Sequence, residues 1–158
     1  MLDYAKSSPK LEICGALLGK RTGSFEEPEE LKILDFVPMA NVSEHGKSVH
    51  YIPDPNELLN VLKRTTHYDN KATLDLVGIF HNHPNNAPRP SITDINGAGY
   101  AGVYIIYSNK TGELSAQYYD GGEQMGFKQA YVMVTGIQTY VSRETTVEPN
   151  NGELVING

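Results

Sequence analysis

The apolar residues of this chain fall into short runs that end at glycine, proline or charged residues, and this pattern constrains the fold most. A short, bounded apolar run is typical of a strand buried in a sheet. The runs that predict strands are 12–19 (EICGALLG), 32–39 (KILDFVPM), 73–80 (TLDLVGIF), 103–107 (VYIIY), 114–119 (LSAQYY) and 130–134 (AYVMV). Residues 108–113 (SNKTGE) join two of these runs and are typical of a hairpin connection.

Helices are predicted at fewer places, namely residues 2–8, 54–64 and 91–101. The second of them has the clearest beginning, because Asp54 can cap a helix and Pro55 suits its first position. Its apolar face is expected to consist of Leu58, Leu59 and Leu62. Strands therefore outnumber helices and the two kinds are mixed along the chain. This order predicts an α+β fold with one largely antiparallel or mixed sheet, flanked by helices.

The chain of 158 residues is long enough to bury the core of one domain. We expect this domain to span residues 1–136 and to be followed by a C-terminal β extension, residues 137–158, that packs on it. In the extension, PNNG stands between TTVE and ELVI, and Asn151-Gly152 is a strong signal for a two-residue turn. A terminal hairpin is therefore predicted there.

The composition excludes several classes of protein. No apolar stretch approaches the roughly 20 residues of a membrane-spanning helix, and the first residues (MLDYAKSSPK) lack the apolar core of a signal peptide. The net charge of −6, with acidic residues gathered at 25–30 (FEEPEE), argues against nucleic acid as a partner and permits basic proteins. The single Cys14 cannot form an internal disulfide, so the cytoplasm is the expected compartment.

Two of the five histidines stand one residue apart, at the end of an apolar run. Side chains alternate along a strand, so His81 and His83 point to the same face, roughly 6.6 Å apart. Two imidazoles placed in this way can bind one cation, although an H-x-H pair is also common at the polar end of a strand. The other histidines lie in polar segments without the spacing of metal ligands and are expected at the surface: His45, His50 and His67.

Seven residues separate His83 from Ser91, and Ser91 and Asp94 lie three apart at the start of the predicted helix. Both side chains then project from nearly one side of its first turn. Two histidines and an aspartate are the ligand count of a catalytic zinc site, which keeps its fourth position for water. The same S-x-x-D pattern is also an ordinary helix cap with its capping box. The two interpretations are compatible, because one hydroxyl can hold the turn and still face a metal.

This pattern, H-x-H-P followed by S-x-x-D and preceded by a glutamate before an apolar strand, resembles the JAMM (MPN+) family of zinc metalloproteases. The resemblance covers about residues 9–120, and the short chain resembles the compact prokaryotic members. It implies a cytidine-deaminase-like MPN fold and one Zn²⁺ per chain, held by His81, His83 and Asp94. It further implies that Ser91 stabilises the tetrahedral intermediate.

The same resemblance implies that the upstream glutamate, Glu12, acts as general base and general acid. Glu12 opens the apolar run 12–19, where an unpaired carboxylate would be costly if it pointed inward. The alternative is a surface glutamate at the end of a strand. Cys14 is expected to be a small core residue, since nothing beside it would activate a thiol.

One residue departs from the pattern of most deubiquitinating members, which carry serine or threonine between the two histidines. Here Asn82 stands at this position and by alternation faces away from the metal. The form HNHP resembles the bacterial RadC branch of the family.

The expected function is hydrolysis of the amide bond after the C-terminal glycine of a ubiquitin-like protein, either in deconjugation or in the processing of a precursor. A Gly-Gly tail could enter as a strand added to a sheet edge. Three alternatives stay open: a peptidase acting on a sulfur-carrier protein adduct, a non-catalytic MPN scaffold, and a RadC-like domain. Neither nucleic acid nor a membrane is an expected partner.

Overall fold

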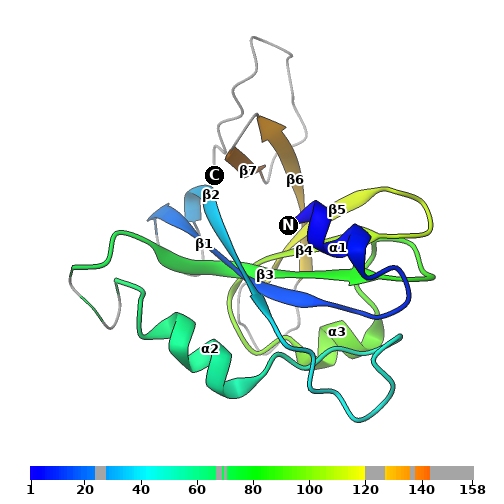
Figure 1. The fold of residues 1–158 in the computed structure, drawn as a ribbon. Helices are drawn as coiled ribbons and strands as arrows, with labels where there is room; N and C mark the ends of the chain where they lie inside the picture. Colours follow the sequence, from blue (N-terminus) through cyan, green and yellow to red (C-terminus); the bar gives the residue numbers. More distant parts are fainter. Residues whose placement is uncertain (24–27, 67–68, 70, 120–126, 136–137, 143–158) are drawn as a thin grey trace.

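The structure is a computed structural model that describes residues 1–23, 28–66, 69, 71–119, 127–135 and 138–142. Its strands are β1 (Cys14–Gly23), β2 (Pro28–Met39), β3 (Asp75–His83), β4 (Gly102–Ser108), β5 (Leu114–Tyr119), β6 (Phe127–Thr135) and β7 (Gln138–Ser142). They form one sheet that closes on itself in the order β1-β2-β7-β6-β5-β4-β3 (Figure 1). Only β3 and β4 pair in parallel, so the sheet is mixed. The expected α+β class is confirmed.

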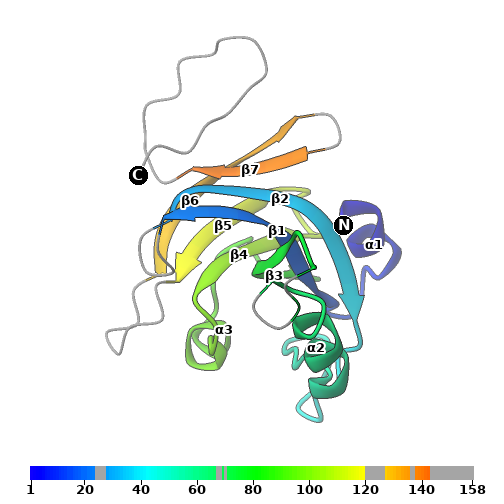
Figure 2. The ribbon, with the colours of Figure 1, turned by 90° about the vertical axis from the view of Figure 1, so that its left-hand side faces the viewer.

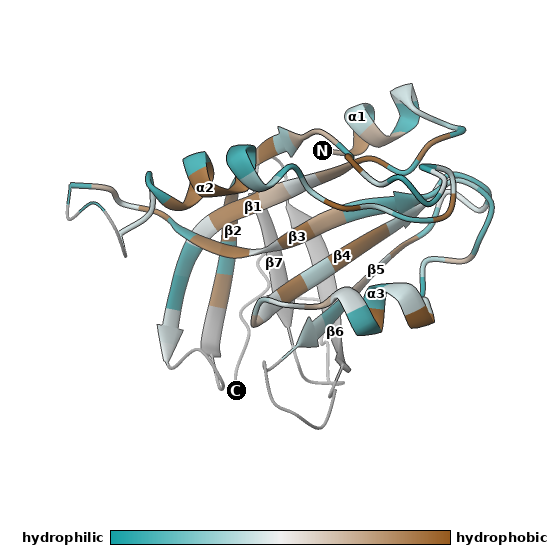
Figure 3. Ribbon diagram, turned by 90° about the horizontal axis from the view of Figure 1, so that it is seen from below, coloured by the Kyte–Doolittle hydropathy of each residue, from teal (hydrophilic) through white to brown (hydrophobic). Residues whose placement is uncertain are grey.

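The described helices are α1 (Leu2–Ser7), α2 (Pro55–Leu62) and α3 (Ile92–Gly97). Helices α2 and α3 lie on one side of the sheet, whereas α1 lies on the other side of β1 and β3 (Figures 1 and 2). Seen from below, α2 and α3 flank the apolar surface of β3 and β4, which lies between them (Figure 3). None of the described helices is long and apolar enough to cross a membrane.

Alternation along β1 and β3 divides the core into two clusters. Leu17 and Phe80 point into the cluster that also contains Ala5 of α1. Their neighbours Ala16 and Ile79 point the other way, into a second cluster that is covered by α2. This continuous burial on both faces explains why these strands are apolar throughout rather than alternating.

The local signals of the sequence are largely confirmed. Asp54 caps α2, since its carboxylate accepts the main-chain N–H groups of Asn56 and Glu57. The third helix was expected to continue to about Ala101 but ends at Gly97, which is a correction. After it Ala98 is extended, and the Tyr100 hydroxyl donates to the Leu76 carbonyl, which draws the chain back to the sheet.

The predicted C-terminal extension is only partly described. Its first strand, β7, was not expected and pairs with both β2 and β6. The hairpin predicted around Asn151-Gly152 lies outside the described residues.

Strand β3 lies between β1 and β4 in the sheet. In the antiparallel pairing of β1 with β3, Cys14 lies opposite His81. On its other side β3 approaches β4 so closely that a Cβ atom on Gly78 would lie 2.0 Å from the carbonyl oxygen of Val103. Only glycine fits there, which explains its place within an apolar strand.

We therefore expect Gly78→Ala to destabilise the protein by about 2 kcal/mol, because the new methyl group meets main-chain atoms that cannot turn aside. Gly97→Ala is the matched control, since nothing lies within 4 Å of its Cβ position, and its effect should stay within about 1 kcal/mol. Equilibrium unfolding in urea measures both. Equal midpoints for the two variants would contradict this account of the β3–β4 contact.

Candidate metal centre

Strand β3 carries both histidines of the H-x-H pair to its end, and their side chains are buried. They point to the same face, as alternation predicts, and the Nε2 atoms of His81 and His83 lie 3.2 Å apart. The strand therefore presents two imidazole lone pairs to one point.

Helix α3 brings a carboxylate to the same point. Oδ1 of Asp94 lies 3.3 Å from Nε2 of His81, and Oδ2 lies 3.3 Å from Nε2 of His83. One ligand atom from each of the three side chains lies within 4.8 Å of the others. Two nitrogens and one carboxylate oxygen are a donor set that suits zinc and leaves a fourth position open. The residues present thus fit the metal that the sequence resemblance implies.

The helix cap orients this carboxylate. Ser91 Oγ accepts the Asp94 main-chain N–H at 3.1 Å, and Ser91 N–H donates to Asp94 Oδ2 at 2.7 Å. The Ser91 hydroxyl also donates to Oδ2, at 2.6 Å. The capping box predicted as an alternative is therefore present, and it holds Asp94 in place beside the histidines.

The two histidines are held in different ways. His83 Nδ1 lies 2.9 Å from the carbonyl oxygen of Ala87, so Nδ1 carries the proton and Nε2 keeps its lone pair. His81 Nδ1 is buried without a hydrogen-bond partner among the described residues. Its ring is instead stacked on Tyr51, with centroids 4.3 Å apart. On its Nδ1 side, the His81 ring is therefore held by packing, whereas its Nε2 side faces Asp94.

The charges of the cluster favour a cation. Burial would raise the pKa of the Asp94 carboxyl, but the hydrogen bonds with His81 and His83 outweigh it and hold that pKa well below its usual range. Burial lowers the pKa of His81. Burial also opposes a charge on His83, yet hydrogen bonds with Asp94 and Ala87 raise its pKa on balance. A carboxylate anion thus faces imidazoles that a divalent cation can bind in place of a proton.

Glu12 is buried, with 4% of its surface exposed, and the alternative of a surface glutamate is wrong. Continuing the register of Cys14 and His81 by two residues places Glu12 opposite His83, on the face covered by α2 and α3. Burial raises the pKa of Glu12 to about 7, the charge on His83 lowers it, and the charge on Asp94 raises it again. Glu12 is therefore a neighbour of the cluster and does not belong to the potential ligand group.

Cys14 takes no part in this site. It is fully buried in the cluster that faces α2, as expected of a core residue. Burial raises the pKa of its thiol to about 12, so it stays protonated.

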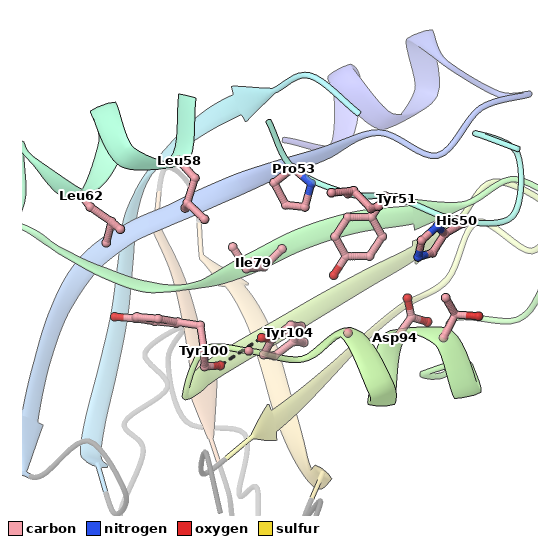
Figure 4. A pocket seen from close by; sticks show the side chains of 13 residues that line it. His50, Tyr51, Pro53, Leu58, Leu62, Ile79, Asp94, Tyr100 and Tyr104 are labelled. Carbon is pink, nitrogen blue, oxygen red and sulfur yellow. Dashed lines mark hydrogen bonds between the residues drawn. The ribbon is translucent and has the colours of Figure 1, made fainter. Parts of the chain in front are cut away.

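A pocket of about 530 Å³ extends from the metal centre between α2 and α3. Apolar and aromatic side chains line it, and Asp94 lies at one end (Figure 4). Leu58 and Leu62 of α2 face Tyr100 and Tyr104 across it. Its position was not predicted, because its walls come from segments far apart in the chain.

The segment before α2 also contributes to this pocket, through His50 and Tyr51. His50 was expected at the surface but is half-buried, and its Nδ1 lies 2.8 Å from the hydroxyl oxygen of Ser43. His45 is exposed, as expected, and His67 lies outside the described residues. The sequence YIP (51–53) beside His50 was the one signal that could have located this wall.

Comparison with known proteins agrees with this geometry. Residues 1–119 match the family described as prokaryotic homologs of the JAB domain. A desampylase of Haloferax volcanii is 29% identical over 121 residues, which are 77% of this chain and 78% of the relative. A desampylase of Pyrococcus furiosus is 32% identical over 110 residues, 70% of this chain and 68% of the relative.

The fold also matches a solved structure. The solution structure of protein DSY2949 from Desulfitobacterium hafniense superposes with a TM-score of 0.55 and 25% sequence identity. The match covers 75% of each chain. It supports the α+β fold with its mixed sheet.

The geometry predicts that His83→Ala lowers zinc affinity by at least about 100-fold, since even the loss of an outer-shell partner costs 10- to 100-fold. Glu12→Gln should keep one zinc per chain, because Glu12 lies beside the ligand group and not within it. His50→Ala is the matched histidine control and should also keep the metal. Elemental analysis and competition with a chromogenic chelator measure all three, and equal affinity of His83→Ala and His50→Ala would contradict the assignment.

In the metal-free protein, the carboxyl carbon of Glu12 should titrate near pH 7 rather than near 4.5. The folded state then binds this proton more tightly than the unfolded state does. Stability should accordingly fall as the pH rises from about 4.5 to about 7, and Glu12→Gln should remove this part of the dependence. Carbon-13 NMR and denaturant unfolding across this range test both, and an ordinary acidic titration would show that Glu12 is solvated.

Proposed function

Because the chain belongs to the family of prokaryotic homologs of the JAB domain, we propose that it is a zinc-dependent isopeptidase. Its substrate would be a ubiquitin-like protein, and the bond cleaved would be the amide after the C-terminal glycine. The observation that carries this proposal is the buried group of His81, His83 and Asp94 beside the buried Glu12. The two desampylases among its relatives support an enzyme rather than a scaffold.

His81, His83 and Asp94 would hold the zinc ion, which supplies Lewis acidity that lowers the pKa of water and polarises a carbonyl group. Glu12 accepts the proton of the attacking water and returns it to the leaving amine. Without the metal, burial raises the pKa of Glu12 to about 7, towards the neutral range in which a carboxyl can both take up and release a proton.

Ser91 would donate a hydrogen bond to the carbonyl oxygen as negative charge develops on it. Its hydroxyl is half-buried and donates to Asp94 in this structure, so it has to turn towards the substrate. The carboxylate stays in place meanwhile, since the main-chain N–H of Ser91 also donates to it. Loss of the hydroxyl should therefore harm the reaction more than metal binding.

The sequence analysis expects the substrate tail to add as a strand to a sheet edge, and the structure offers a second route. Each of the seven described strands has a neighbour on both sides, although β2 pairs with β7 only over Leu31–Ile33. The pocket between α2 and α3 is a better route, because it is apolar and ends at Asp94. We propose that the C-terminal tail of the substrate lies in this pocket.

The surroundings of the pocket favour a folded protein as the substrate. Several large apolar side chains are exposed on segments that carry site or pocket residues: Leu11 next to Glu12, Ile52 in the pocket wall, Leu59 in α2 and Ile92 in α3. Exposed apolar side chains gathered around a site are typical of a protein interface. A sulfur-carrier protein adduct would use the same surface and the same chemistry, and the choice of substrate distinguishes it.

The proposal predicts clean release of a ubiquitin-like protein that is joined through its C-terminal glycine to a lysine side chain. Mass spectrometry of the zinc-loaded protein with this conjugate, and with a linear fusion, measures the products and the bond cleaved. Sulfur-carrier adducts form a second arm of the same experiment. No release in either arm, despite one bound zinc, would refute the proposed reaction.

Three controls assign the roles of the residues in this experiment. Glu12→Gln should keep the zinc and lose turnover, and a chelator should abolish turnover of the wild type. Ser91→Ala should keep the zinc and lower the rate by roughly 10²–10³, the usual cost of losing an oxyanion donor. Wild-type rates in Glu12→Gln would remove Glu12 from the mechanism.

A further inference from the structure

Asn82, the residue between the two metal-binding histidines, is completely buried and makes all its side-chain contacts on the opposite face of β3. Its Oδ1 accepts the main-chain N–H of Ile13 at 2.6 Å. Its own main-chain N–H donates to the carbonyl oxygen of Ile13 at 3.3 Å. Both main-chain polar groups of Ile13 are thus bound by one residue, and Ile13 directly follows Glu12.

The side-chain amide nitrogen of Asn82 binds the chain on the other side of Glu12. It lies 3.3 Å from the carbonyl oxygens of both Ser8 and Leu11, and it also contacts Oδ1 of Asn109. Its two N–H groups are therefore shared among three acceptors. Asn82 holds the residue before Glu12 and the residue after it.

Glu12 itself is held by a different segment. Its N–H donates to the carbonyl oxygen of Lys47 at 2.6 Å, and its carbonyl oxygen accepts from the side chain of Asn41 at 2.9 Å. These bonds come from the segment before α2, whereas those of Asn82 come from the central strand. The main chain at Glu12 is thus fixed from two directions.

Such fixing is needed because the Glu12 carboxyl is buried, and a buried carboxyl without fixed support would turn towards water. We propose that Asn82 is a positioning residue for Glu12. It touches neither metal nor substrate, and it holds Leu11 and Ile13 so that the Glu12 side chain stays beside His83. This inference rests on the proposed function only for the role of Glu12 in proton transfer.

The chemistry explains why asparagine suits this position. One carbonyl oxygen meets the N–H of Ile13, and one NH₂ group meets the carbonyl oxygens, so a single amide satisfies both kinds of group. Aspartate would keep the acceptor and place a negative charge against the carbonyl oxygens of Ser8 and Leu11. Alanine would remove the acceptor of the Ile13 N–H and the donor shared by Ser8 and Leu11, and the Leu11 carbonyl would keep only the Ser8 hydroxyl.

The opposite directions of the histidines and Asn82 make the inference testable. Asn82→Ala should keep one zinc per chain with affinity within about threefold, because His81 and His83 point away from the substitution. Amide hydrogen exchange at Ile13 should become at least about 10-fold faster. Turnover of the conjugate should show kcat reduced about 10- to 100-fold with KM within about twofold, the cost of a misplaced catalytic group.

A double-mutant cycle separates positioning from a general structural effect. In the Glu12→Gln background, Asn82→Ala should cause no further loss of the residual rate. Thr65→Val is the matched control, since it removes another buried polar group, whose hydroxyl donates to the Leu62 carbonyl. It should change neither Ile13 exchange nor kcat. An equal loss from Asn82→Ala in both backgrounds would overturn the inference.

A readout without substrate keeps this inference separate from the proposed function. Zinc should shift the carboxyl carbon resonance of Glu12 in the wild type, and this shift should shrink by more than half in Asn82→Ala. If Asn82→Ala does not fold, Asn82→Asp replaces it in this measurement. Aspartate keeps the acceptor of the Ile13 N–H, so amide exchange at Ile13 should stay slow, whereas the zinc-induced shift of Glu12 should still be reduced. An unchanged zinc-induced shift would overturn the inference. A reduced shift would support it, even if the protein cleaves no conjugate.

Discussion

The pairing of β1 with β3 is the interaction on which the site depends. It places Cys14 opposite His81, and so brings Glu12 beside His83 although the two are far apart in the chain. The glycine at 78 lets β4 approach the other side of β3. Because β3 is enclosed on both sides and both faces, its last residues are buried. Burial gives each charge in the cluster the low-dielectric surroundings in which it acts strongly.

The short segment Ser91 to Asp94 serves structure and chemistry with the same atoms. The capping box ends in the carboxylate that approaches the histidines, so the start of α3 and the candidate metal site form together. The two interpretations of S-x-x-D, a helix cap and a metal-ligand position, are therefore compatible in the folded chain. A cap fixes the direction of a side chain, and a metal ligand requires a fixed direction.

Features set by neighbours in sequence could be predicted. The strand that carries His81 and His83, the cap of α2 and the cap at Ser91 all follow from alternation or from capping patterns. Features set by distant contacts could not. The pocket joins helices separated by a strand and a loop, the stacking of Tyr51 on His81 crosses 30 positions, and the early end of α3 depends on where Tyr100 docks.

In the proposed reaction, the side chains on the two faces of β3 have different roles. One face presents His81 and His83 to the metal, and the other presents Asn82 to the main chain around Glu12. A rigid strand cannot move one set without the other, so the distance between the metal ligands and the base is fixed by backbone geometry. In this proposal, the residue within the H-x-H pair supports Glu12 rather than the metal. A change at this position would act on proton transfer before it acted on metal affinity.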